Sequence, residues 1–150
     1  MARLQPEQAE HFRAMPMPSF EATPAVPGPP LAERRVALLS TAGLHRRSDP
    51  AFALMSADYR VIPGDVDPND LLMSHISVNF DRSGFEQDWN VVFPLERLHE
   101  LADRGEIGSV AGYHYAVMGA TDPAQMEASA RELAGLLHAD HVDALLLVPV

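Results

Sequence analysis

The pattern of apolar and polar positions divides the chain from residue 34 onward into buried strands and amphipathic helices. Short apolar runs bounded by turn residues predict strands at residues 36–40, 59–62, 71–78, 113–118 and 142–150. Apolar positions at helical spacing predict helices at residues 94–104 and 122–138. Because the strands alternate with helices, the pattern indicates an α/β protein with a mainly parallel sheet.

The predicted helices have well-marked ends. Pro94 suits the first turn of a helix and Gly105 a left-handed C-terminal cap, while Asp122 and Pro123 are typical of an N-terminus. The helix that starts there leads into the mostly apolar strand at residues 142–150, which we expect in the middle of a parallel sheet. The fold class is therefore predicted as three-layer α/β, doubly wound and Rossmann- or flavodoxin-like.

The first part of the chain has a different composition. A short helix is predicted at residues 6–13, and the prolines that follow favour an extended segment. We therefore expect a proline-rich N-terminal arm at residues 1–33 and one α/β domain at residues 34–150.

The densest group of polar side chains lies at residues 74–94, after the strand predicted at residues 71–78. Open α/β sheets bind ligands at this end of their strands. His75 is a candidate proton carrier near neutral pH, and Asp88 is its candidate orienter or the partner of a cationic amine. Asn90 lies beside them. A turn and a helix cap before Pro94 remain the alternative for Asp88 and Asn90.

His114 stands between two tyrosines in a predicted strand, so alternation places it on the face opposite both rings. It either projects into a site or is a buried, hydrogen-bonded histidine, and both interpretations stay open. His75, His114 and a carboxylate have metal-ligand chemistry without short ligand spacing. The acidic loop at residues 65–70 lacks the glycine and glutamate of an EF-hand, so it is interpreted as a capping turn. We predict neither a metal nor a cofactor.

Composition and charge exclude several classes of function. The formal net charge of −10 disfavours binding to nucleic acid. No apolar run approaches the ~20 residues that span a bilayer, and the N-terminus lacks the apolar core of a secretory signal. We therefore expect a cytoplasmic protein with no membrane partner. The chain contains no cysteine, so it holds no thiol nucleophile of its own.

The last predicted strand ends at Pro149 and Val150 without a polar tail. We expect the sheet to be incomplete at this end, because doubly wound folds place functional loops at the carboxyl edge. An unpartnered apolar strand edge also favours aggregation or a homo-oligomer.

Five segments carry a resemblance to a known family. They read RVALLSTAGLH, YRVIPGDVDPNDL, SHISVNFD, DWNVVFPLERLHELADRGEIGSVAGYHYAVMG and VDALLLVPV. In this order they resemble the selenoprotein B component of the glycine/sarcosine/betaine reductase family, from about Arg34 to Val150. The proline-rich segment is expected to lie outside the resemblance.

The resemblance implies a reductase that attacks an activated amine substrate with selenocysteine or cysteine and works with other proteins of a reductase complex. In the family, the redox motif follows the strand that corresponds to VDALLLVPV. No catalytic residue is therefore expected before Val150, and His75, Asp88, Asn90 and His114 are the residues expected to line the site. We hypothesise that an in-frame UGA codon was translated as a stop.

Three functions remain at this point. The first is a reductase component that lacks the nucleophile, and the second is a non-catalytic α/β module that binds a small molecule or a protein. The third and weakest is a metal-dependent hydrolase.

Overall fold

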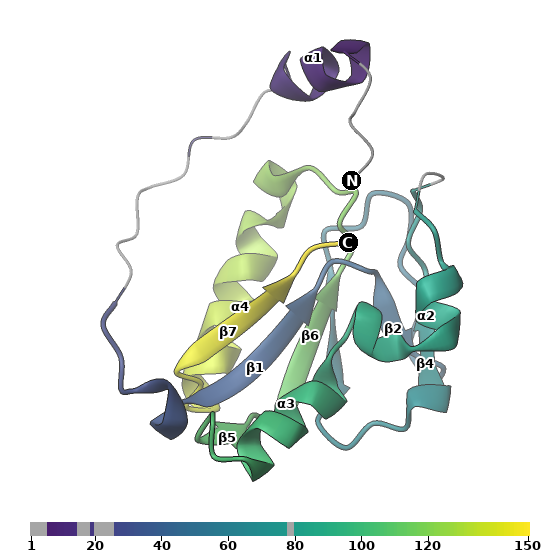
Figure 1. Ribbon diagram of the computed structural model, residues 1–150. Helices are drawn as coiled ribbons and strands as arrows, with labels where there is room; N and C mark the ends of the chain where they lie inside the picture. Colours follow the sequence, from purple (N-terminus) through teal and green to yellow (C-terminus); the bar gives the residue numbers. More distant parts are fainter. Residues whose placement is uncertain (1–5, 15–18, 20–25, 78–79) are drawn as a thin grey trace.

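The computed structural model describes residues 6–14, 19, 26–77 and 80–150. Its centre is a five-stranded sheet whose strands come from distant parts of the sequence (Figure 1). These strands are β1 (Arg35–Ser40), β3 (Tyr59–Pro63), β5 (Ser109–Val110), β6 (Tyr113–Val117) and β7 (Ala144–Val148). The chain is therefore a mixed α/β protein, as the alternating pattern predicts.

β1 is the central strand because it pairs along both of its edges. Along one edge it runs parallel to β7, with Leu38 opposite Leu146. Along the other edge it runs parallel first to β5 and then to β6. β3 completes the sheet as the antiparallel partner of β6. The sheet is thus mainly parallel, as predicted, with one antiparallel edge strand.

A separate two-stranded antiparallel sheet joins β2 (Leu44–Arg46) to β4 (Leu71–Met73). Gly43, whose φ is 65°, turns the chain from β1 into β2. One sequence prediction is wrong here, because the strand expected at residues 71–78 is three residues long and lies outside the main sheet. β2 was not predicted. A short apolar run does not specify which strand it pairs with, because the pairing depends on how the chain brings the two segments together.

The two long helices match their predicted positions. α3 (Leu95–Asp103) is followed by Gly105 with φ 68°, the conformation expected of a left-handed cap. α4 (Glu127–Ala139) is preceded by a 3-10 turn, η4 (Pro123–Met126), and the carboxylate of Asp122 accepts the N–H of Ala124 at 3.0 Å. The N-terminal signal of the second helix is therefore confirmed, although its first turn is 3-10.

Shorter helical elements complete the described chain. α1 (Pro6–Ala14) matches the helix predicted at residues 6–13, whereas α2 (Ser83–Gln87) was not predicted. Three more 3-10 turns are η1 (Leu31–Glu33), η2 (Pro68–Asp70) and η3 (Trp89–Val91). Asp67 caps η2 by accepting the N–H of Asn69 at 2.8 Å, which confirms the capping turn.

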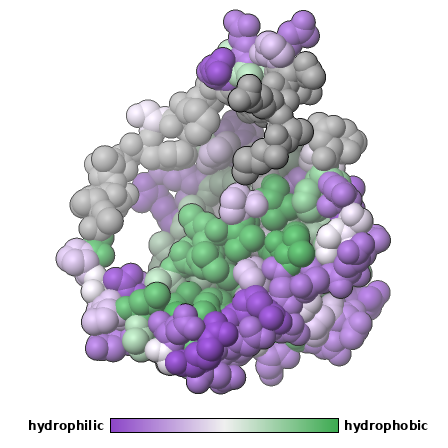
Figure 2. All heavy atoms as spheres, in the orientation of Figure 1, coloured by the Kyte–Doolittle hydropathy of each residue, from purple (hydrophilic) through white to green (hydrophobic). Residues whose placement is uncertain are grey.

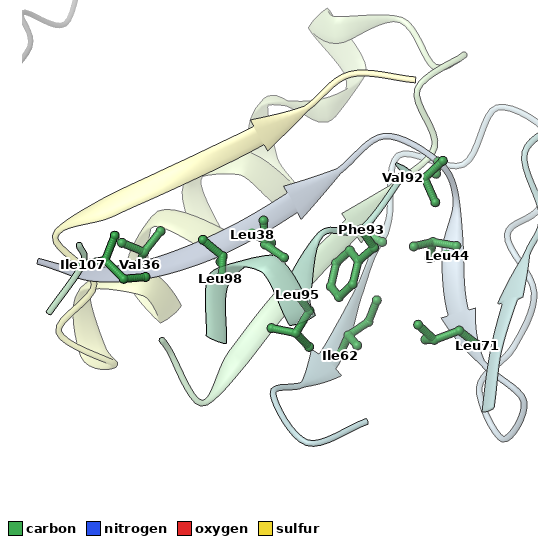
Figure 3. Close-up of a cluster of buried hydrophobic side chains, with 12 residues drawn as sticks. Val36, Leu38, Leu44, Ile62, Leu71, Val92, Phe93, Leu95, Leu98 and Ile107 are labelled. Carbon is green, nitrogen blue, oxygen red and sulfur yellow. The ribbon is translucent and has the colours of Figure 1, made fainter. Parts of the chain in front are cut away.

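Two apolar cores lie on opposite faces of the main sheet. The larger one contains Leu38 of β1, Leu98 of α3, and Phe93, which lies just before α3 (Figure 3). On the other face, Leu133 of α4 packs against Tyr115 and Val117 of β6. The Rossmann- or flavodoxin-like connectivity of a fully doubly wound sheet stays a prediction.

β7 lies at the edge of the sheet and not in its middle, which corrects the sequence prediction. Within the described residues, β1 is the strand that pairs with it. Leu146 and Leu147 are 41% and 62% exposed, and Figure 2 shows hydrophobic surface gathered over the face seen in Figure 1. The pattern of a helix followed by an apolar strand predicts that the strand belongs to the sheet. Its position within the sheet depends on which strands pair with it.

Most of the predicted extended segment in the N-terminal arm, residues 15–18 and 20–25, lies outside the described residues. Among the helices of the described part, none combines the length and apolarity needed to cross a membrane.

Candidate functional site

A pocket of about 470 Å³ opens between β4, α2, η3 and the start of α3. We call it the acidic pocket, because three carboxylate side chains and two aromatic rings are among its lining residues. The lining residues are Pro68, Asn69, Leu71, Phe85, Glu86, Gln87, Asp88, Trp89 and Glu96. A mixture of carboxylates and aromatic rings is the chemistry that recognises small organic cations.

Asn90 organises one wall of the acidic pocket. Its amide Nδ2 donates to Oδ1 of Asp88 at 2.9 Å and to Oε2 of Glu96 at 2.7 Å. Its Oδ1 accepts the N–H of Glu96, in the first turn of α3, at 3.2 Å. Asn90 is itself buried, so this network holds two carboxylates at fixed positions while it caps the helix.

Asp88 is exposed and ionised at neutral pH. Hydrogen bonds from the side chain and then the backbone N–H of Asn90 hold the pKa of Asp88 below its ordinary value. Its Oδ1 accepts both of these bonds, each at 2.9 Å. The capping alternative for Asp88 and Asn90 thus has a clear structural basis, and it is compatible with Asp88 lining the pocket.

The two aromatic rings of the pocket are anchored in the main core. Trp89 lies 6.0 Å from Phe93, measured between ring centroids. Phe85 and Trp89 both pack against the buried cluster. Because the core holds one side of each ring in place, the exposed side of each ring faces the pocket without a large rearrangement.

His75 lies in the loop after β4 and is 6% exposed. Its Nδ1 accepts the N–H of Ser77 at 3.2 Å, so the neutral ring carries its hydrogen on Nε2, which is buried without a partner among the described residues. Its carbonyl oxygen accepts a hydrogen bond from Arg82. Burial, and next the charge of Arg82, lower the pKa of His75.

His114 is fully buried in β6. Its Nδ1 accepts the N–H of Leu38 at 3.0 Å, in the stretch of β1 between its pairings with β5 and β6. The ring meets Phe93 edge to face, on the side of the sheet opposite the core of Tyr115. Burial lowers the pKa of His114 to about 4. The structure therefore shows the buried, hydrogen-bonded histidine that sequence analysis left as one of two interpretations.

The four residues proposed from the sequence fall into three places. Asp88 and Asn90 form one network at the acidic pocket, whereas His75 and His114 are absent from its lining. Glu96, Phe85 and Asn69 also line the pocket, although sequence analysis did not single them out as site residues. Glu96 carried a weak signal, since a carboxylate in the first turn of a helix is a common capping partner.

In the described part of the chain, no group of three or more histidine, aspartate or glutamate side chains is arranged to hold a metal ion. The pairing of His75 with His114 considered from the sequence is accordingly not formed, because the two rings lie in separate environments.

Comparisons with known proteins place this α/β chain among reductase components. The sequence matches the model of the glycine/sarcosine/betaine reductase selenoprotein B family over residues 2–150. The chain therefore belongs to this family. The match includes the N-terminal segment, so the expectation that the resemblance begins near Arg34 is wrong.

Curated relatives agree with this assignment. The D-proline reductase subunit gamma of Acetoanaerobium sticklandii is 34% identical over 120 residues, which cover 78% of this chain and 49% of the relative. The glycine reductase complex component B subunit gamma of Symbiobacterium thermophilum is 32% identical over 142 residues, or 88% of this chain and 32% of the relative. The chain thus spans about half or a third of these relatives. No solved structure matches the chain.

Proposed function

We propose that this chain forms the substrate-binding part of a reductase of the selenoprotein B family and binds a small amine in the acidic pocket. The observation that carries the proposal is the meeting of Glu86, Asp88 and Glu96 with Phe85 and Trp89 in one pocket of about 470 Å³. Glycine, sarcosine, betaine and proline all carry a cationic nitrogen. Carboxylates attract this charge, and aromatic faces stabilise it further.

His75 is proposed to serve the reaction as a hydrogen-bond donor from Nε2. Support comes from its lowered pKa, which keeps the ring neutral near pH 7, and from the backbone N–H that occupies Nδ1. A base role at Nδ1 would require the Ser77 N–H to be displaced. His114 is proposed to be a structural residue, because it is fully buried against Phe93 and its Nδ1 accepts the N–H of Leu38.

The reducing nucleophile is proposed to come from outside this sequence, because the chain contains no cysteine. A selenol or thiol supplied by a further segment or by another protein of the complex would attack the bound amine substrate. The names of the relatives, subunit gamma and component B, support a complex with other reductase proteins. We further propose that the α/β domain starts near residue 34 and that the protein works in the cytoplasm.

We also propose that the reading frame continues through an in-frame UGA codon that encodes selenocysteine. The length of the relatives and the absence of cysteine support this hypothesis. Sequencing the nucleotides after the Val150 codon tests it. A UAA or UAG codon there, or a downstream frame without cysteine, contradicts it.

The alternative function is a non-catalytic α/β module that binds small molecules or proteins, and the lack of a thiol favours it for the chain acting alone. The two functions differ in one measurement. A reductase component increases thiol-dependent cleavage of the amine when it is added to the remaining reductase proteins, whereas a binding module does not.

The amine site is tested by titrating the protein with betaine and with 3,3-dimethylbutanoate, which has the same shape without the cationic nitrogen. Trp89 is the single tryptophan of the chain, so its fluorescence reports on the acidic pocket. We expect betaine to change the fluorescence and to bind about 5-fold or more tightly than the analogue that lacks the cationic nitrogen. Equal affinities would contradict recognition of the cation.

Matched variants locate the amine. Glu86→Gln removes one pocket carboxylate and is expected to weaken betaine binding about 3- to 10-fold. Glu100→Gln removes an exposed carboxylate of α3 that does not line the pocket, and it is expected to leave the affinity unchanged. Equal effects of both variants would indicate long-range charge attraction and not a site.

A further inference from the structure

A second pocket lies on the opposite face of the main sheet, between β3, β6 and the last turn of α4. Its volume is about 390 Å³. We call it the tyrosine groove, because two tyrosines form one wall. Its lining residues are Val61, Tyr113, Tyr115, Leu136, Ala139 and Asp140. The acidic pocket shares none of these residues, so the groove is a separate site.

The charged group among the lining residues of the tyrosine groove is the carboxylate of Asp140. Its Oδ1 accepts a hydrogen bond from Nη2 of Arg35 at 2.7 Å, and its backbone carbonyl oxygen accepts one from Nε of the same guanidinium at 2.8 Å. Its Oδ2 is buried and has no hydrogen-bond partner among the described residues. A buried carboxylate oxygen without a donor is costly, so a ligand that donates to it gains affinity.

The charge around Asp140 restricts the ligand. Arg35 lies in ion-pair contact with Asp140 and neutralises it, so a cationic ligand would meet the guanidinium as well as the carboxylate. An anionic ligand would be repelled by the free Oδ2. A neutral molecule with one N–H donor satisfies Oδ2 without either conflict.

The remaining walls select the shape of the ligand. Tyr113 is 52% exposed and Tyr115 is buried, and both side chains line the same groove from one face of β6. Burial, and next the charge of Asp140, raise the pKa of Tyr115, so its hydroxyl is neutral at physiological pH. Val61, Leu136 and Ala139 add apolar surface. Aromatic and aliphatic walls favour a flat ring.

We propose that the tyrosine groove binds a neutral heteroaromatic molecule whose ring contacts Tyr113 and whose N–H donates to Oδ2 of Asp140. The amine of the reductase reaction is cationic and is proposed to bind on the other face. The groove would therefore accept a second, chemically different ligand.

The test uses indole as the neutral ring with an N–H and 1-methylindole as the matched ring without it. Each is titrated into the 15N-labelled 150-residue chain, and the amide shifts are followed by NMR. We expect indole to bind with a Kd on the order of 1 mM and to shift the amides of Tyr113, Leu136 and Asp140. We expect 1-methylindole to bind about 10-fold more weakly, since it cannot donate to a charged acceptor.

Variants on the exposed side of α4 localise the ligand. Ala139→Leu fills the groove and is expected to weaken indole binding about 10-fold or more, whereas Ala134→Leu, also exposed on α4 but outside the groove, should not change it. If Ala139→Leu fails to fold, Tyr113→Ala removes the exposed wall, with Tyr113→Phe as its control. Tyr113→Ala should weaken binding and Tyr113→Phe should preserve it.

Three results would overturn the proposal: equal binding of the two indoles, unchanged indole binding in the groove variants, or indole shifts confined to the acidic pocket. The proposed amine function can fail independently, because betaine is followed through Trp89 and indole through the amides of the groove.

Discussion

At the scale of single residues, His75 and His114 are held in the same way by different parts of the fold. In each ring Nδ1 accepts a backbone N–H, from Ser77 and from Leu38, and Nε2 is buried without a partner among the described residues. Burial lowers the pKa of both rings. Both histidines are therefore neutral at physiological pH, and protonation of either ring opposes the folded structure.

The pH dependence of stability should report on His114. Its pKa falls from 6.5 to about 4 in the folded protein because of burial, and electrostatic interactions with His99 and Arg35 lower it further, whereas Asp140 raises it. The unfolded chain therefore takes up the proton first, so this contribution is fully present above pH 6.5 and is lost as the pH falls toward 4. Between pH 7 and pH 5 the loss amounts to about 2 kcal/mol.

Urea unfolding at pH 7 and pH 5 measures this loss. His114→Gln keeps a hydrogen-bond acceptor for Leu38 but does not titrate, so its pH dependence should be smaller by about 2 kcal/mol. His138→Gln changes an exposed histidine and should leave the pH dependence of the wild type intact. If His114→Gln keeps the full dependence, another group is responsible.

At the scale of elements, close backbone contacts fix how the strands begin. Gly108 lies beside the segment that enters β1, and its N–H donates to the carbonyl of Arg34 at 3.0 Å. A Cβ atom at Gly108 would lie 2.4 Å from the carbonyl carbon of Glu33. This contact is tighter than van der Waals packing permits. The close approach of the segments that begin β1 and β5 therefore requires a residue without a side chain at position 108.

Gly108→Ala is therefore expected to destabilise the protein by about 1–3 kcal/mol, because the backbone must move apart. Gly135 lies within α4 and has open space around its Cβ position. Gly135→Ala should stabilise the protein by about 0.5–1 kcal/mol through helix propensity. Urea unfolding of both variants checks the pair. Equal changes in both would show that the contact at Gly108 has no energetic effect.

At the scale of the whole molecule, β7 gives the sheet an apolar edge. Leu147 is 62% exposed on this strand, and the hydrophobic surface in Figure 2 covers the same region of the molecule. Such an edge offers both unpaired backbone groups and apolar side chains to another chain. We therefore predict that the chain self-associates through β7.

Leu147→Lys should reduce concentration-dependent association, measured by sedimentation velocity, because a lysine on an edge strand opposes pairing. Leu54 is 77% exposed but lies in a turn outside the strands. Leu54→Lys adds the same charge and should leave association unchanged. A wild-type chain that stays monomeric at all concentrations would show that the edge does not associate.

The sequence by itself determined the elements whose signals are local. Helical spacing and the end signals at Gly105 and Asp122 placed α3 and α4, and apolar runs placed β1, β3 and β6. The sequence also marked Asp88 and Asn90 as one polar cluster. These predictions succeed because a helix, a cap or a strand depends on residues a few positions apart.

Only the tertiary structure decided which distant residues meet. It placed β7 at an edge, separated β2 and β4 from the main sheet, and brought Glu96 to Asn90. It also set Asp140 beside Arg35, which is 105 residues earlier, and so formed the tyrosine groove. Local periodicity does not encode such contacts, because they depend on pairing and packing between segments that are remote along the chain.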